Sequence, residues 1–376
     1  MSTPPDRIPS RAPLTSEAAA LAQGKPPGRP LAEQAAELWS PLSAMLPPAL
    51  ELFKARGEGR VKPWPFPPAL ASLGAVLGGG IWPGCYVLAG GTGTGKSQLC
   101  MELALHGARE LGGAVGYVGL ELSPAGISAR VLGNVEGKPW PGAWFGRWTP
   151  DAGAVAELSR LPFYATFSTA YGFTPERLRL AALGLRHLHP QDDPLPPLLI
   201  LDYLQLIGDD PEQRRELRQR IAAAAAVGRD VARELGVIVL LVSSVAREHY
   251  ARLIFDGPPT EPPVAFVGIG KEAGEVEFSA DGLIVLAKGK RGTGARDARI
   301  WLGLAKARAM DSEGIPAVES WPAVPFWWPL DFDGARFHPL TCSALTTLQR
   351  EAGTLDGATR GGPGAHPRRP RRGGRS

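Results

Sequence analysis

The chain has 376 residues, of which 44% are hydrophobic, and this suits one large domain with extensions. Its net charge is +4, but the positive charge is concentrated at one end. Residues 357–376 hold six arginines and no acid, so the rest of the chain carries −2. A globally basic body is therefore excluded, and any contact with nucleic acid must come from local groups. The three cysteines, Cys85, Cys100 and Cys342, match no metal spacing and predict a reducing, cytoplasmic compartment. No apolar run suits a signal peptide or a membrane span.

The two ends of the chain read as extensions. Residues 1–30 are rich in Pro and Arg, and we expect them to be disordered, like the basic tail 346–376. The tail is either a solvated extension or an anchor for phosphate backbones or an acidic partner. Residues 31–62 predict a helical linker whose pieces are broken by Pro41, Pro47 and Pro48. It is either a linker helix that docks on a neighbouring subunit or a local amphipathic cap.

Residues 63–345 alternate apolar strands with helices, which predicts an α/β domain with a mostly parallel sheet covered by helices on both faces. The expected strands are 85–89, 115–120, 163–166, 198–201, 237–242, 282–287 and 300–305. One helix is expected directly after Gly95. Three more are expected at 124–132, 175–188 (with Thr174 as N-cap) and 211–235. Residues 247–275 and 311–330 read as long loops. The tryptophans at 140, 144 and 148 favour packing of a loop over a stacking platform.

A phosphate-binding loop follows the first of these strands. The motif G-x-x-x-x-G-K-[ST] is matched completely by Gly90, Gly91, Thr92, Gly93, Thr94, Gly95, Lys96 and Ser97, and a helix beginning with Gln98 follows. Glycines let successive N–H groups turn toward one anion, and the helix N-terminus adds partial positive charge. We expect these residues and Gln98 to bind ATP, with Lys96 on the β- and γ-phosphates and Ser97 on Mg²⁺.

Two carboxylates end neighbouring apolar strands. Asp202 follows Leu198–Leu201, at the edge where the phosphate loop is expected, and is a candidate ligand of Mg²⁺. Glu121 follows the strand that ends at Leu120 and is a candidate general base for the attacking water. Both residues could instead have structural roles: Asp202 as an ordinary turn residue at the end of a strand, and Glu121 as a helix cap.

Together these segments resemble the motor domain of the DnaB-type replicative helicases, which has the RecA-like fold. The resemblance is carried by Gly119-Leu120-Glu121-Leu122-Ser123 and by Asp202-Tyr203-Leu204-Gln205-Leu206-Ile207. It covers roughly 66–340 and includes the approach to the phosphate loop, 77–84. It implies an ATP hydrolase that needs Mg²⁺ and works on single-stranded DNA as a ring, with a hexamer as the expected form.

The resemblance also assigns roles at less similar positions. Ser244 stands where the family has a glutamine that senses the γ-phosphate, and its side chain is shorter. Arg247, Lys271, Glu272 and Gly274 match segments that contact single-stranded DNA. Lys306 and Arg308 resemble a Lys-x-Arg pair that enters the ATP site of the neighbouring subunit. A second basic cluster, Lys288, Lys290 and Arg291, is the alternative for this last role.

Three functions follow from these features. The first is an ATP-driven helicase or translocase of DNA replication or a mobile element, with a loader or primase-like partner. The second is a non-unwinding RecA-like ATPase switch that regulates or loads a nucleic-acid-processing partner. Ser244, and about 60 Pro-rich residues where the family has a helical N-terminal domain, favour the second. The third, a recombination-mediator ATPase, is disfavoured by the segment at 202–206.

Overall fold

The computed structural model describes residues 41–167, 172–189, 195–210, 212–256, 259–270, 276–277, 280–289, 300–308 and 327–340. The chain divides into two compact units, Met1–Arg60 and Val61–Ser376. The described part of the first unit is the helix α3 (Leu42–Gly57) with the few residues around it. No helix within the described ranges has the length and apolar character needed to cross a bilayer.

Helix α3 corrects one expectation. Pro47 and Pro48 do not break it, since both lie inside the helix. The carbonyls that lose a hydrogen-bond donor to these prolines belong to Ser43 and Ala44 in the first turn, and both residues are exposed. Water can therefore satisfy these carbonyls, and the helix continues to Gly57.

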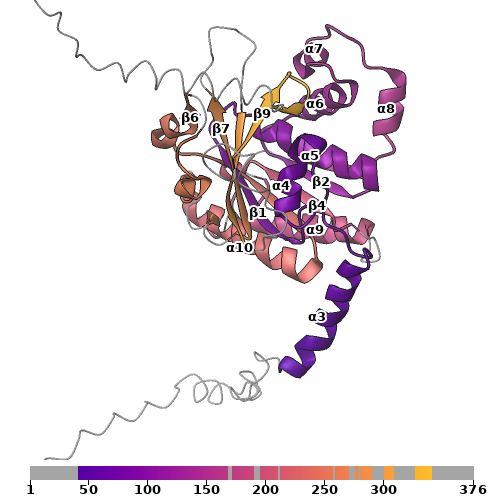
Figure 1. The fold of residues 1–376 in the computed structure, drawn as a ribbon, viewed down its shortest axis with the longest axis vertical. Helices are drawn as coiled ribbons and strands as arrows, with labels where there is room; N and C mark the ends of the chain where they lie inside the picture. Colours follow the sequence, from indigo (N-terminus) through magenta and orange to yellow (C-terminus); the bar gives the residue numbers. More distant parts are fainter. Residues whose placement is uncertain are drawn as a thin grey trace, which may run out of the picture. The chain divides into compact units, whose positions relative to one another are not determined.

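The second unit is built on one large sheet (Figure 1). In the described residues ten strands join it, in the order β10-β9-β8-β7-β1-β5-β4-β2-β3, with β6 paired to β7. The strands that pair in parallel are β1 (Gly84–Gly90), β2 (Val115–Gly119), β3 (Phe163–Phe167), β4 (Leu198–Asp202), β5 (Ile238–Ser244), β6 (Ile254–Phe255) and β7 (Gly282–Gly289). The antiparallel end consists of β8 (Ile300–Ala307), β9 (Trp327–Phe332) and β10 (Phe337–Pro339). The predicted fold class, a mostly parallel sheet, is confirmed.

Helices cover both faces of this sheet (Figure 1). One face packs against α4 (Ala71–Val76) and α5 (Lys96–Leu111), and the other against α9 (Pro175–Leu188) and α10 (Leu217–Leu235). Beyond α5 lie α6 (Pro124–Glu136), α7 (Trp140–Trp144) and α8 (Ala152–Leu158). Short 3₁₀ turns are η1 (Pro68–Leu70), η2 (Leu204–Leu206), η3 (Arg247–His249), η4 (Ala251–Leu253) and η5 (Pro263–Phe266).

A hydrophobic core lies on each face of the sheet, and side chains along β1 point alternately into one core and the other. Cys85, Val87 and Ala89 are buried on the side of α9 and α10, whereas Leu88 faces the core under α5. This alternation is the period of two expected for a strand buried on both faces. Both cysteines within the described residues, Cys85 and Cys100, are free and buried.

Helix capping sets most of the boundaries. The Thr174 hydroxyl accepts a hydrogen bond from the N–H of Arg177, which confirms the predicted N-cap of α9. Helix α10 begins at Leu217, later than the predicted 211, because Glu216 and Gln219 form a reciprocal capping box.

The stretch 247–275 is also more ordered than the predicted loop. Its described part contains η3, η4, β6 and η5, and Val245 pairs with Gly270 in an antiparallel bridge. The predicted loop 311–330 lies mostly outside the described residues, although its end forms β9.

Candidate functional site

The phosphate loop joins the end of β1 to the start of α5. Gly93 and Gly95 have φ angles of 69° and 90°, which L side chains rarely adopt. A Cβ on Gly90 would lie 2.8 Å from Thr94 Oγ1 and 2.9 Å from Leu286 O, so a side chain there would force the loop to shift. The glycines are thus required by the shape of the loop, and the N-terminus of α5 opens onto it.

Lys96 heads the helix and lies across the loop. Its Nζ donates to Gly90 O at 2.8 Å and to Gly91 O at 3.0 Å. Burial lowers the pKa of Lys96, and the charge of Asp202 opposes that change. The ammonium is therefore held at the loop by two carbonyl oxygens.

A cavity of about 380 Å³ opens in front of the loop. Its phosphate-loop side consists of Thr92, Gly93, Gly95, Lys96, Ser97 and Gln98. Its other walls are Glu121, Leu122, Arg130, Trp140, Asp202, Tyr203, Ser244 and Phe332. Backbone donors, a helix N-terminus, an ammonium, a hydroxyl and two carboxylates are the groups that hold a nucleoside triphosphate with Mg²⁺. The residues present therefore fit both.

The two predicted carboxylates meet at this cavity because β2 and β4 are parallel neighbours. Gly119 pairs with Asp202, so Glu121, two residues past Gly119, lies at the same edge of the sheet. Asp202 is only 1% exposed and accepts a hydrogen bond from the Tyr117 hydroxyl. Burial first, and the neighbouring charge of Asp202 second, raise the pKa of Tyr117 well above its ordinary value, so the phenol stays protonated and donates.

Arg130 is a cavity residue that no motif of the sequence singles out. It projects from α6 and lies over the ring of Trp140, 4.0 Å from guanidinium carbon to ring centre. Burial lowers its pKa, while Tyr117, Asp202 and Glu121 act in the opposite direction. Trp140 is thus a wall of the cavity as well as a packing residue. The signal in the sequence was a cation two turns into the helix that follows Glu121.

Ser244 ends β5 beside the phosphate loop, since it pairs with Gly90. Its backbone is held by the side chain of Gln205: the N–H of Ser244 donates to Gln205 Oε1 at 3.0 Å, and Gln205 Nε2 donates to Ser243 Oγ at 2.9 Å. The end of β5 is therefore clamped to the segment that follows Asp202.

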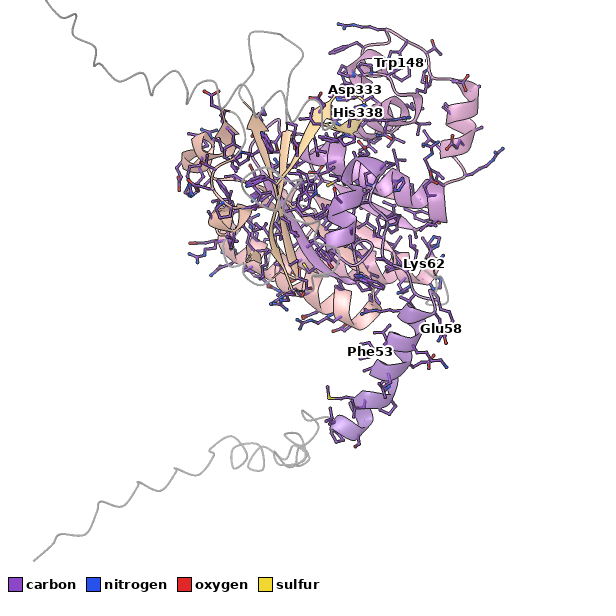
Figure 2. The ribbon with its side chains drawn as sticks, viewed as in Figure 1. Phe53, Glu58, Lys62, Trp148, Asp333 and His338 are labelled. Atoms are coloured by element: carbon purple, nitrogen blue, oxygen red, sulfur yellow. The ribbon has the colours of Figure 1, made fainter. Side chains whose placement is uncertain are left out.

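The β9–β10 hairpin lies against α5. Gln98 lines the cavity, but its Nε2 donates to Ala335 O at 2.9 Å, so its amide holds the hairpin turn. Asp333 closes the turn by accepting from the N–H groups of Ala335 and Arg336 at 2.7 and 2.8 Å. His338 contacts the same carboxylate at 2.7 Å, and Figure 2 shows the two side chains together.

Lys306 and Arg308 lie far from this chain's own phosphate loop. Strand β8 runs antiparallel to β7, so the end of β8 lies beside the starts of β7 and β1. These starts are at the end of the sheet opposite the phosphate loop. There Arg308 forms an ion pair with Asp281 at 3.2 Å, and Lys306 Nζ donates to Glu277 O at 3.4 Å. The direction of a strand is not encoded in an apolar run, so the sequence could not show this placement.

Lys288, from the alternative basic cluster, lies at the phosphate-loop edge. It is near the end of β7, which is parallel to β1. Its Nζ is 3.2 Å from the point where a Cβ on Gly93 would lie. Lys290 and Arg291 are outside the described residues.

The residues predicted to contact DNA belong to two segments of the chain. Arg247 is exposed on η3, just past β5. Lys271, Glu272 and Gly274 are outside the described residues, but the stretch that leads to them is held by Glu277, which accepts from Gly268 N at 2.5 Å. Burial raises the pKa of Glu277 to about 7, against the backbone hydrogen bonds that lower it.

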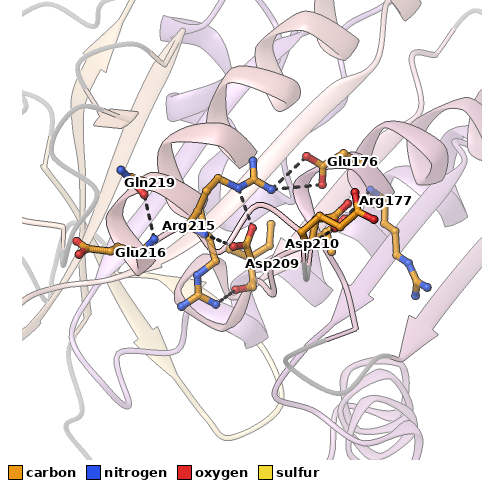
Figure 3. A network of polar contacts seen from close by, with 11 residues as sticks. Glu176, Arg177, Asp209, Asp210, Arg215, Glu216 and Gln219 are labelled. Carbon is orange, nitrogen blue, oxygen red and sulfur yellow. Dashed lines mark hydrogen bonds and ion pairs between the residues drawn. The ribbon is translucent and has the colours of Figure 1, made fainter.

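The loop before α10 is ordered by a network of charged side chains (Figure 3). Arg215 Nε donates to Asp209 Oδ1 at 2.7 Å, and its Nη2 donates to Glu176 Oε1 on α9 at 3.1 Å. The neighbouring Arg214 is exposed, with a φ of 48°. The network therefore fixes the part of the chain that carries Arg214.

Solved structures with this architecture include an ATPase domain, with a TM-score of 0.59 and 15% identity over 78% of this chain and 97% of that one. A structure of a DnaB-like replicative helicase, described together with its interactions with primase, has the same TM-score and identity over 88% of this chain and 73% of that one. At this identity the likeness concerns the fold, and the predicted RecA-like fold is confirmed.

A curated relative, the probable plasmid replicative DNA helicase of Chlamydia psittaci, is 26% identical over 201 residues. The match takes in 53% of this chain and 41% of the relative, so this chain spans less than half of that protein's length. The family model described as DnaB-like helicase C terminal domain matches residues 69–311, more than half of the chain. The chain therefore belongs to the family of DnaB-like helicase C-terminal domains.

Proposed function

We propose that the protein is an ATP-dependent DNA helicase or translocase that acts on single-stranded DNA as a ring oligomer, in DNA replication or in a mobile-element process. The observation that carries this proposal is the meeting of Lys96, Glu121 and Asp202 at one cavity beside the phosphate loop, in a chain of the DnaB-like family. The replicative helicase named among its relatives supports the same reading.

In this proposal each cavity residue has one task. The loop N–H groups and Lys96 bind the triphosphate, and Ser97 and Asp202 hold Mg²⁺. The metal neutralises charge on the phosphates when it is bound. Glu121 is exposed to the cavity and takes the proton of the attacking water. Arg130, which lines the same cavity, contributes a positive charge that balances the two carboxylates.

The cation that completes the site is a separate proposal. We propose that Lys306 and Arg308 supply it to the ATP site of a neighbouring copy, because a cation that acts across a subunit interface must lie away from its own phosphate loop. Both residues lie at the end of the sheet opposite the loop, where Arg308 is paired with Asp281. Lys288, beside the phosphate loop of its own chain, is the alternative. Mixing Glu121→Gln subunits with Arg308→Ala or with Lys288→Ala subunits tests this. Rescue of hydrolysis in the Arg308→Ala mixture supports the first assignment, and rescue only in the Lys288→Ala mixture would refute it.

Assembly into a ring is supported by α3. Leu42, Leu46, Leu50 and Phe53 are 46–66% exposed, at spacings that place them on one face of the helix. We propose that this face docks on a neighbouring copy of the chain. Figure 2 shows Phe53 on α3. A Phe53→Glu variant should give a lower mass by light scattering than wild type, while Lys54→Glu, which changes an exposed neighbour, should not.

DNA would pass the edge of the sheet that carries Arg247 and the ordered loop before α10, where cations can contact phosphates. A primase-like or loader partner belongs to the same proposal, since one of the solved structures similar to this chain is described with its interactions with primase. A reducing, cytoplasmic compartment also belongs to it, and the buried free thiols Cys85 and Cys100 support it.

The alternative is a RecA-like ATPase that switches partners without unwinding. It is favoured by Ser244, whose short side chain ends β5 where a longer group could reach the phosphates.

ATP hydrolysis with and without single-stranded DNA, followed by displacement of a strand from a forked duplex, separates the two functions. Stimulation with displacement supports the helicase, and stimulation without displacement supports the switch. Normal hydrolysis by a Lys96→Ala protein would refute both.

A further inference from the structure

One tyrosine contacts the phosphate loop from a distant part of the chain. The hydroxyl of Tyr250 lies 3.0 Å from Thr92 Oγ1, in the phosphate loop. Its ring lies over the same loop, since a Cβ on Gly91 would be 3.9 Å from its Cδ1. The loop and Tyr250 are 158 residues apart in the chain, so this contact is a product of the tertiary fold.

The hydroxyl also lies within the influence of the site's charges. The pKa of Tyr250 is lowered first by its hydrogen bond with Thr92. The positive charge of Lys96 also lowers it. Thr92 lines the cavity, so the hydroxyl lies at its rim.

The segment that carries Tyr250 is anchored on both sides of it. Val245 and Leu253 are 1% and 2% exposed and belong to the core. Between these anchors lie the exposed Arg247 and the half-buried Tyr250. A change in the position of the hydroxyl is therefore passed to a short, fixed stretch of chain rather than dissipated in a long loop.

The end of β5 that precedes this segment is also fixed. Gln205 holds the N–H of Ser244, and it follows the magnesium candidate Asp202 by three residues. Hydrogen bonds thus join Tyr250 to the phosphate loop, and they join the end of β5, just before the segment that carries Tyr250, to the segment after β4.

We propose that Tyr250 is a positioning residue that couples the phosphate loop to the segment bearing Arg247, through the hydrogen bond between its hydroxyl and Thr92. The inference rests on the proposed function, because it takes ATP as the ligand of the loop. It adds a residue through which nucleotide binding reaches the DNA side of the molecule. Tyr250 does this without contact with the reacting atoms.

Hydrogen–deuterium exchange of the full chain, with and without Mg²⁺ and the slowly hydrolysed analogue ATPγS, tests the coupling. In wild type the analogue should slow exchange in the peptides covering 90–98 and 245–256. Tyr250→Phe removes only the hydroxyl. It should leave the effect at 90–98 and reduce the slowing at 245–256 by about fivefold, the worth of one net hydrogen bond. Tyr164→Phe, which removes an exposed hydroxyl bonded to His189, should behave like wild type.

The other outcomes are also decisive. A merely structural Tyr250 would speed exchange at 245–256 equally with and without the analogue, and would leave the ratio unchanged, which overturns the proposal. Slowing at 90–98 but not at 245–256 in wild type would overturn it as well, while ATP binding by the loop would stand. Absence of slowing at 90–98 in wild type would refute the proposed function and the coupling with it.

Discussion

Glu102 makes the stability of the protein depend on pH in a predictable way. It lies on α5, one turn after Gln98, is 7% exposed, and accepts a hydrogen bond from Phe337 N at 2.8 Å. Burial raises its pKa from 4.5 to about 7, although Phe337 N and the charges of His338 and Arg336 act against this. The change Glu102→Gln keeps the acceptor and the shape but removes the titration.

The sign and size follow from linkage. Because the pKa is higher in the folded than in the unfolded chain, the contribution of Glu102 to stability is complete below pH 4.5 and is lost as the pH rises through about 7. At about 1.4 kcal/mol per pH unit, the difference between the unfolded pKa of 4.5 and the folded pKa of about 7 corresponds to about 3 kcal/mol of stability. Between pH 5 and pH 8, the stability of Glu102→Gln relative to wild type should therefore rise by about 2.5 kcal/mol.

Urea denaturation of wild type and of Glu102→Gln at several pH values measures this difference in stability directly. Glu277, whose pKa is also raised to about 7, is present in both proteins, so its contribution cancels in the difference. Glu234→Gln is a matched control of opposite sign. The ion pair with Arg179 lowers the pKa of Glu234, so that variant should lose stability relative to wild type as the pH rises through 4.5. A flat difference curve for Glu102→Gln would refute the reasoning, since it would mean that the carboxyl is solvated when folded.

Three further changes test the packing and the site. Gly107→Ala would place a Cβ 2.2 Å from Trp64 Cε2, so it should cost about 1–3 kcal/mol of unfolding free energy in urea. Gly184→Ala, in a helix with nothing within 4 Å of the new Cβ, should instead stabilise by about 0.5–1 kcal/mol in the same assay. Tyr117→Phe leaves the buried Asp202 without this donor and should cost about 1–3 kcal/mol, part of which Mg²⁺ with ATPγS should restore in a thermal melt.

The sequence predicted those features that depend on neighbours in the chain. The phosphate loop is local, since strand, glycines, lysine and helix follow one another within 90–97. Glu121 and Asp202 were predictable because parallel strands end at the same edge, so two strand-ending acids must lie near one another. Their actual roles in catalysis stay predictions.

Features that depend on pairing between distant segments were not predictable. Tyr117 contacts Asp202 across 85 residues, and Tyr250 contacts Thr92 across 158. Nothing in an apolar strand says which neighbour it will pair with or in which direction. For the same reason the placement of Lys306 at the edge opposite the phosphate loop required the antiparallel pairing of β8.

The end of the described chain also supports the site. Gln98 and Glu102, one turn apart on α5, both bind the β9–β10 hairpin, at Ala335 O and Phe337 N. The ring of Phe337 also packs under the loop, 3.0 Å from the point where a Cβ on Gly95 would lie. These contacts lie beyond residue 311, where the family match ends. Because the helix that begins with Lys96 is fixed at its first two turns by the hairpin, the position of the phosphate loop depends on a segment that carries no nucleotide motif of its own.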